Sequence, residues 1–78
     1  MTDSEREGVK KLHRECTAAL DKYLKEGYEM CRILSAIEDH PVSHERREAI
    51  IRQRVKENEA QLAYDSARQA LFTLAGWI

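Results

Sequence analysis

The stretch Glu38-Asp39-His40-Pro41-Val42-Ser43 decides the fold. It contains the single proline of the chain, and proline disfavours helical geometry at the residue before it and cannot donate a backbone hydrogen bond. Ser43 is a residue type that caps helix beginnings, and Glu45 follows it in the expected first turn. The stretch therefore predicts the end of one helix and the start of a second, antiparallel one.

Long segments with apolar residues at helical spacing lie on both sides of this turn. The 78 residues include three glycines, and Leu, Ala, Glu, Lys and Arg, which favour helices, are frequent. We predict an all-α fold: an antiparallel two-helix hairpin with helices at about 4–39 and 43–75, in one domain spanning 1–78. Thr2 and Ser4 each precede a glutamate by three residues, which is the spacing of a capping box.

The apolar residues of the first helix fall in one sector about 140° wide on a helical wheel. Gly27 lies inside this sector, and the pattern passes through it without a shift. We therefore expect a continuous helix that another helix approaches closely at Gly27; a break there, giving three helices, is the alternative. The sector consists of Val9, Leu12, Cys16, Ala19, Leu20, Tyr23, Leu24, Gly27, Met30, Cys31, Leu34 and Ile37.

The second helix has two apolar faces rather than one. Ile51, Val55 and Leu62 share one face with Asn58, whereas the apolar residues from Ala60 onward are rotated by roughly 140°. Such a helix either contacts different neighbours along its length, or it bends or breaks near residues 57–61, and the lack of Gly and Pro there favours the first interpretation. Asn58 could fix the register of a helical assembly or lie at the wet edge of the face. Gly76 resembles a residue that ends a helix, with Trp77 or Ile78 folding back on it.

A lone hairpin covers each helix with one neighbour, which is too little for a 140° face. We therefore expect two hairpins to pack as a two-fold symmetric homodimer, a four-helix bundle. The residues expected to self-associate are Leu20, Tyr23, Leu24, Gly27, Cys31, Ile51, Val55, Asn58 and Leu62. The apolar carboxyl-terminal end is expected to bind a partner, another helical protein, through Leu71, Phe72, Leu74, Trp77 and Ile78.

Cysteine and histidine residues give no strong sign of a metal site. Cys16 and Cys31 lie about 22 Å apart along one helix, too far for a disulfide, and are expected to be small buried residues. His13 with Cys16, and His40 with His44, have spacings that can hold a metal, but neither pair has further ligands nearby. We expect no metal and no cofactor, with His13 partly buried at the edge of the apolar sector.

Catalytic patterns are also missing from the sequence. It contains no nucleophile next to a base, no paired carboxylates in an apolar setting and no glycine-rich phosphate loop, so no catalytic residue is expected. The 13 basic and 14 acidic residues nearly cancel to a net charge of -1, which gives no strong attraction to nucleic acid or membranes. The polar amino-terminal residues do not resemble a signal peptide, so we expect a cytoplasmic location.

The resulting hypothesis is a small, non-catalytic protein–protein interaction module, an adaptor or chaperone-like hairpin that self-associates. The alternative is a dimer that binds nucleic acid through the basic start of the second helix. That segment contains Arg46, Arg47, Arg52, Arg54 and Lys56, but glutamates alternate with these residues, so a solvated helix surface is the preferred interpretation.

Overall fold

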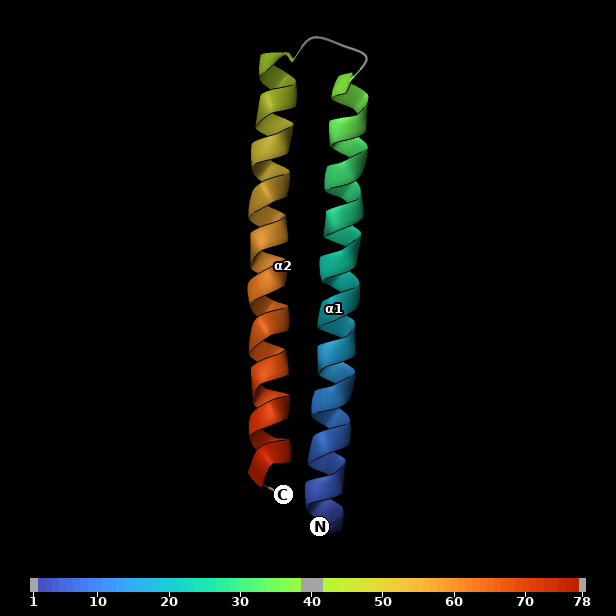
Figure 1. Cartoon of the computed structure of the whole chain (residues 1–78), viewed down its shortest axis with the longest axis vertical. Coiled ribbons are helices and arrows are strands. Elements are labelled where there is room, and N and C mark those ends of the chain that lie inside the picture. The colour runs from blue at the N-terminus through green and yellow to red at the C-terminus, as the bar shows by residue number, and fades with distance from the viewer. Residues whose placement is uncertain (1, 39–41, 78) are drawn as a thin grey trace.

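The chain forms two long antiparallel helices, α1 (Asp3–Glu38) and α2 (His44–Trp77). The computed structural model describes residues 2–38 and 42–77, without the side chain of Trp77. The helices pack along their whole length into a rod of 59 × 14 × 14 Å, with the start of α1 and the end of α2 at the same end (Figure 1). The predicted all-α hairpin is confirmed. Pro41, on which it was based, and Ile78 lie outside the described residues.

Both helices begin with the caps that the sequence predicts. The backbone N–H of Glu5 donates to the Thr2 hydroxyl at 3.2 Å, and the Glu5 carboxylate accepts from the backbone N–H and hydroxyl of Thr2. These reciprocal bonds form a capping box. At the start of α2, the backbone N–H of Arg46 donates to the Ser43 hydroxyl at 3.2 Å. Each cap satisfies backbone donors that a helix start leaves without intrahelical partners.

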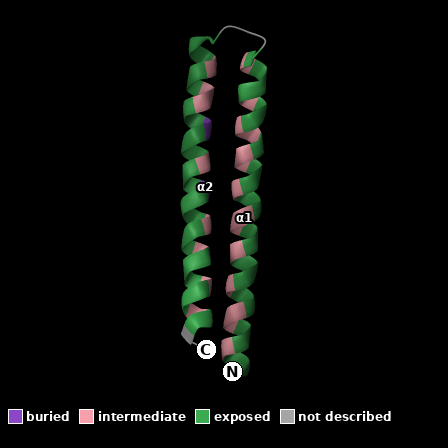
Figure 2. Cartoon of the chain, in the orientation of Figure 1, coloured by how far each residue is buried: buried purple, intermediate pink, exposed green. Residues whose placement is uncertain are grey.

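The two helices meet along one seam, visible as the half-buried stripe on their facing sides in Figure 2. Its positions alternate in steps of three and four residues, which is the repeat of a coiled coil. Ala60 is the one hydrophobic residue that is buried in the part of the chain described, and the rest of the seam is half-buried except for buried Gln53. The seam consists of Val9, Leu12, Cys16, Ala19, Tyr23, Glu26, Met30, Ile33 and Ile37 from α1, and Ile50, Gln53, Glu57, Ala60, Tyr64, Ala67, Leu71 and Leu74 from α2.

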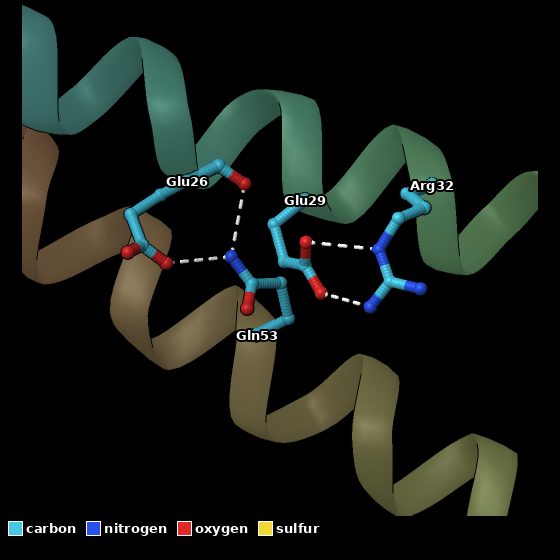
Figure 3. Close-up of polar contacts among 4 residues, drawn as sticks. All are labelled: Glu26, Glu29, Arg32 and Gln53. Carbon is cyan, nitrogen blue, oxygen red and sulfur yellow. Dashed lines mark hydrogen bonds and ion pairs between the residues drawn. The ribbon is translucent and has the colours of Figure 1, made fainter.

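A polar contact between the helices lies within this seam. Gln53, which is 4% exposed, donates from its side-chain amide to the backbone carbonyl of Glu26 at 2.9 Å and to the Glu26 carboxylate at 2.7 Å (Figure 3). Farther along the seam, the rings of Tyr23 and Tyr64 lie 6.2 Å apart between centroids. The amide contact is directional, so it favours one register of the two helices over others.

The seam explains the two apolar faces of α2. The helix is continuous from His44 to Trp77, so the alternative of a break near residues 57–61 is wrong. The seam positions in its first half include two polar residues, Gln53 and Glu57, which a search for apolar spacing passes over. Ile51 and Leu62, which the apolar pattern selected instead, are 63% and 67% exposed and point away from α1.

Three local expectations need correction. Gly76 lies within α2, and no described glycine has a positive φ, so α2 does not end in a left-handed glycine. His13 is exposed rather than partly buried, and Cys31 is exposed rather than buried. His13 lies at the edge of the apolar sector and Cys31 within it, but that sector is wider than the strip that one neighbouring helix can cover. α1 continues through Gly27, as the unbroken pattern predicts.

Candidate interaction surface

A row of apolar residues runs along α1 beside the seam, and α2 covers it only in part. We call this row the α1 strip, and its residues follow the same alternation of three and four as the seam. Leu24 and Leu34 are 50% and 47% exposed, Cys31 is exposed, and the other two members are half-buried. The α1 strip consists of Leu20, Leu24, Gly27, Cys31 and Leu34.

The centre of the α1 strip is a shallow hollow. It is lined by Leu24, Gly27, Tyr28 and Cys31 of α1, together with the seam residues Tyr23 and Glu57. A β-carbon built on Gly27 would lie 3.7 Å from the Glu57 carboxylate, which is ordinary van der Waals contact. Tyr28 beside the hollow is 75% exposed. The glycine therefore creates open space on the surface rather than close contact with α2.

The α2 residues next to the α1 strip are polar. Arg54, Asn58 and Gln61 line a second hollow together with Leu34. On a helical wheel, the opposite side of the seam carries charged residues on both helices, and the hollow there is lined by Lys22, Glu26, Lys56, Glu59, Ala60 and Ala63. Near the middle of the hairpin the two sides therefore differ: one carries the apolar α1 strip, and the other is charged.

The second exposed apolar group lies on the outer side of α2. Ile51, Val55 and Leu62 are all at least half exposed, and Asn58 is exposed at the edge of this group. Of the residues predicted to self-associate, Tyr23 lies in the seam, where it packs on Tyr64. The others lie on the α1 strip or on this outer side of α2.

The residues predicted to bind a partner at the carboxyl-terminal end are placed in different ways. Leu71 and Leu74 belong to the seam, where they are half-buried against α1. Phe72 points outward at 56% exposure, with the Arg68 guanidinium carbon 5.2 Å from its ring centroid. The side chain of Trp77, and Ile78, lie outside the described residues. Phe72 is therefore the member of this set that the described structure presents to solvent.

One ion pair on α1 joins two side chains that lie a turn apart on the same helix. Glu29 and Arg32 form a two-point ion pair on α1, with one bond at 3.0 Å (Figure 3). The hydrogen bond from Arg32 holds the pKa of the Glu29 carboxyl below its ordinary value, and Lys56 on α2 adds a smaller effect in the same direction. The same pair raises the pKa of the Arg32 guanidinium. Such an exposed pair orients two side chains but contributes little to stability.

The basic start of α2 is interleaved with acceptors. The Arg52 guanidinium donates to the Glu48 backbone carbonyl at 3.4 Å, and the Glu48 carboxylate lies 3.0 Å from His44. Arg54 lies beside Glu57 and Asn58 in the second hollow. This segment therefore presents no run of cations uninterrupted by acidic or neutral groups.

The described residues form neither a metal-binding cluster nor a membrane-spanning segment. Within residues 2–38 and 42–77, no three His, Cys, Asp or Glu side chains gather in a way that could hold a metal ion. Neither helix, over the part described, has a stretch long and apolar enough to cross a bilayer. Comparisons with protein-family models, with curated proteins and with solved structures found no match. The exposed apolar surfaces are thus the main candidate for a functional site.

Proposed function

We propose that this chain is a small, non-catalytic protein–protein interaction module that acts as a self-associated hairpin. Two copies form a two-fold symmetric four-helix bundle, and the carboxyl-terminal end around Phe72 is a second contact, for another helical protein. The free thiols of Cys16 and Cys31 suit a reducing compartment, so the proposal includes a cytoplasmic location.

The observation that carries the proposal is the amount of surface that the single hairpin leaves exposed. Its accessible surface is 6192 Å², whereas a compact monomer of 9.1 kDa is expected to expose about 4,900 Å². The excess of roughly 1,300 Å² is larger than the ~800 Å² that each partner contributes to a standard protein–protein interface. A second copy could cover much of the excess without new folding.

The nature of the exposed residues supports the same conclusion. Ile51, Val55 and Leu62 lie together on the outer side of α2 and are each at least half exposed, and large apolar side chains gathered on a surface are typical of interaction sites. Helices with more than one apolar face occur where each contacts more than one neighbour.

The solution mass tests this proposal. Light scattering after size exclusion, over a dilution series from high to low micromolar protein, is expected to give twice the 9.1 kDa chain mass throughout. Replacing Phe72 by serine is expected to leave this mass unchanged, because that residue belongs to the other contact. A well-folded species with the mass of one chain at every concentration would contradict self-association.

A further inference from the structure

The glycines of α1 show where a second helix approaches. A β-carbon on Gly8 would lie 3.3 Å from the Leu74 side chain, which is tighter than usual, so packing within the hairpin accounts for that glycine. A β-carbon on Gly27 would meet Glu57 at an ordinary 3.7 Å. Glycine costs a helix interior about 1 kcal/mol relative to alanine. The packing of α1 on α2 does not require glycine at position 27. A helix from another molecule that crosses closely over this position would require it, because a larger residue would hold the two backbones apart.

From this we infer that the α1 strip binds the α1 strip of a second copy in antiparallel orientation, with Gly27 at the two-fold axis. The inference rests on the proposed self-association and specifies its geometry. The residues of the α1 strip are spaced alternately by three and four positions, which is the spacing at which the side chains of two helices interdigitate in a coiled coil. It therefore acts as a second seam on α1, beside the one that α2 fills.

The α1 strip is complementary to itself about Gly27. Leu20 and Leu34 lie seven residues before and after this glycine, so a two-fold axis there places each beside the other in the second copy. Leu24 and Cys31, three before and four after, form the next pair in the same way. An unrelated helix would need to supply this matching pattern, whereas a second copy has it.

The antiparallel direction is also the one in which the two helix macrodipoles oppose each other, as those of α1 and α2 already do within the hairpin.

This geometry leaves both ends of the assembly free. With Gly27 at the centre, α1 overlaps its copy over about residues 16–38, a length of roughly 35 Å. The first turns of α1 and the last turns of α2, including Phe72, extend beyond the overlap. The surface proposed for a different protein is therefore accessible at each end of the dimer.

Disulfide trapping tests the orientation. Two chains are made with Cys16 and Cys31 replaced by serine; one carries Leu20→Cys, and the other, extended by a tag of distinct mass, carries Leu34→Cys. Disulfides require Cα atoms within about 7 Å. Mild oxidation of the mixture is expected to give mainly the cross-linked 20–34 product, and each chain oxidised alone is expected to give at least fivefold less product. A matched mixture of Ile51→Cys and Leu62→Cys chains serves as the control.

The outcomes separate this inference from the proposed function. Stronger linking of Leu20→Cys to itself, or of Leu34→Cys to itself, would overturn the antiparallel orientation. A dimer by light scattering with no linking in either mixture, or with linking only in the control, would overturn the α1 strip as the interface and leave self-association intact. A monomer by light scattering would overturn both the proposed self-association and the antiparallel interface inferred from it.

A second measurement addresses Gly27 itself. Gly27→Ala is expected to weaken dimerisation at least tenfold, because two methyl groups at the axis separate the helices, although the hairpin has room for each. Gly76→Ala, where an added β-carbon meets nothing within 4 Å, is the control and should leave the dimer dissociation constant unchanged. Equal or tighter dimerisation of Gly27→Ala would overturn the close crossing at this glycine.

Discussion

The side-chain amide of Gln53 on α2 donates to both the backbone carbonyl and the carboxylate of Glu26 on α1, at 2.9 and 2.7 Å. This contact joins residues 27 positions apart, and Gln53 is 4% exposed. A buried amide bonded across a seam is satisfied in one register only, because a shift of α2 along α1 would leave it unpaired. The pair therefore determines which residues of α1 lie opposite which residues of α2.

The first prediction concerns a charge at this position. Gln53→Glu replaces a donor by a second carboxylate facing Glu26, so the free energy of unfolding should fall by about 2 kcal/mol at pH 7. Urea denaturation at fixed protein concentration and pH 7 measures the loss. Gln61→Glu, the same change at an exposed position of α2, should not show it.

The second prediction concerns the ion pair on α1. Because Arg32 lowers the pKa of Glu29, the pair stabilises the fold above the ordinary carboxyl pKa and loses this effect as the pH falls through the lowered value. Arg32→Gln should raise the Glu29 pKa toward its ordinary range, as followed by NMR titration of the side-chain carboxyl carbon. Lys10→Gln, which removes the partner of Glu7 instead, should leave Glu29 unchanged. An unaltered Glu29 titration in Arg32→Gln would show that the ion pair is not formed in solution.

The third prediction concerns the start of α2. Ser43→Ala removes the hydroxyl that accepts from the Arg46 backbone N–H, so unfolding should require about 1 kcal/mol less. Ser35→Ala, at an exposed position inside α1, should be neutral or slightly stabilising, since alanine is the better helix former. The two urea midpoints, compared with that of the unchanged chain, measure both effects. Similar midpoints for the two variants would show that the cap contributes nothing.

The fourth prediction concerns the contact of Gly8 with Leu74. Gly8→Val adds a branched side chain where even a β-carbon is crowded, so it should cost about 1–3 kcal/mol through overpacking. Adding Leu74→Ala should cost less in this variant than in the unchanged chain, because the smaller residue makes room for the valine. Thermal unfolding of the four chains in this cycle measures the coupling. Additive effects would mean that the two residues do not touch in solution.

The helix boundaries could be predicted well from the sequence because short-range chemistry sets them. The Thr2–Glu5 spacing and Ser43 mark the two starts, and both caps are formed. The end of α2 could not be predicted from Gly76, because glycine also fits a helical turn and nothing in the sequence requires a positive φ there.

The pairing of the helices was harder to predict than their existence. Apolar spacing selects Ile51 and Val55 in the first half of α2, whereas the seam there contains Gln53 and Glu57. The missed signal was the three–four alternation of Ala60, Tyr64, Ala67 and Leu71, which leads to Glu57 and Gln53 when extended backward. Judged by hydrophobicity alone, such polar residues are predicted to face solvent. A side-chain amide can nevertheless occupy a seam position when its hydrogen bonds are made there.

The residues of the candidate interaction surface could be predicted from the sequence, but their division between the seam and the exposed surfaces could not. Leu24 and Cys31 were grouped with the apolar sector of α1, which the sequence could not divide into the part that α2 covers and the part it leaves exposed. That division depends on where the α2 backbone passes, and a polar contact, Gln53 with Glu26, fixes it.

The shared end of α1 and α2 has a mechanical consequence (Figure 1). A force that pulls the start of α1 away from the end of α2 loads the seam one layer at a time, beginning with Gly8 and Leu74, so the hairpin unzips at low force. A force between that end and the turn instead acts along the 59 Å axis, and the two helices carry it along their own length rather than through the seam. The same molecule should therefore yield easily in one direction and resist in the other.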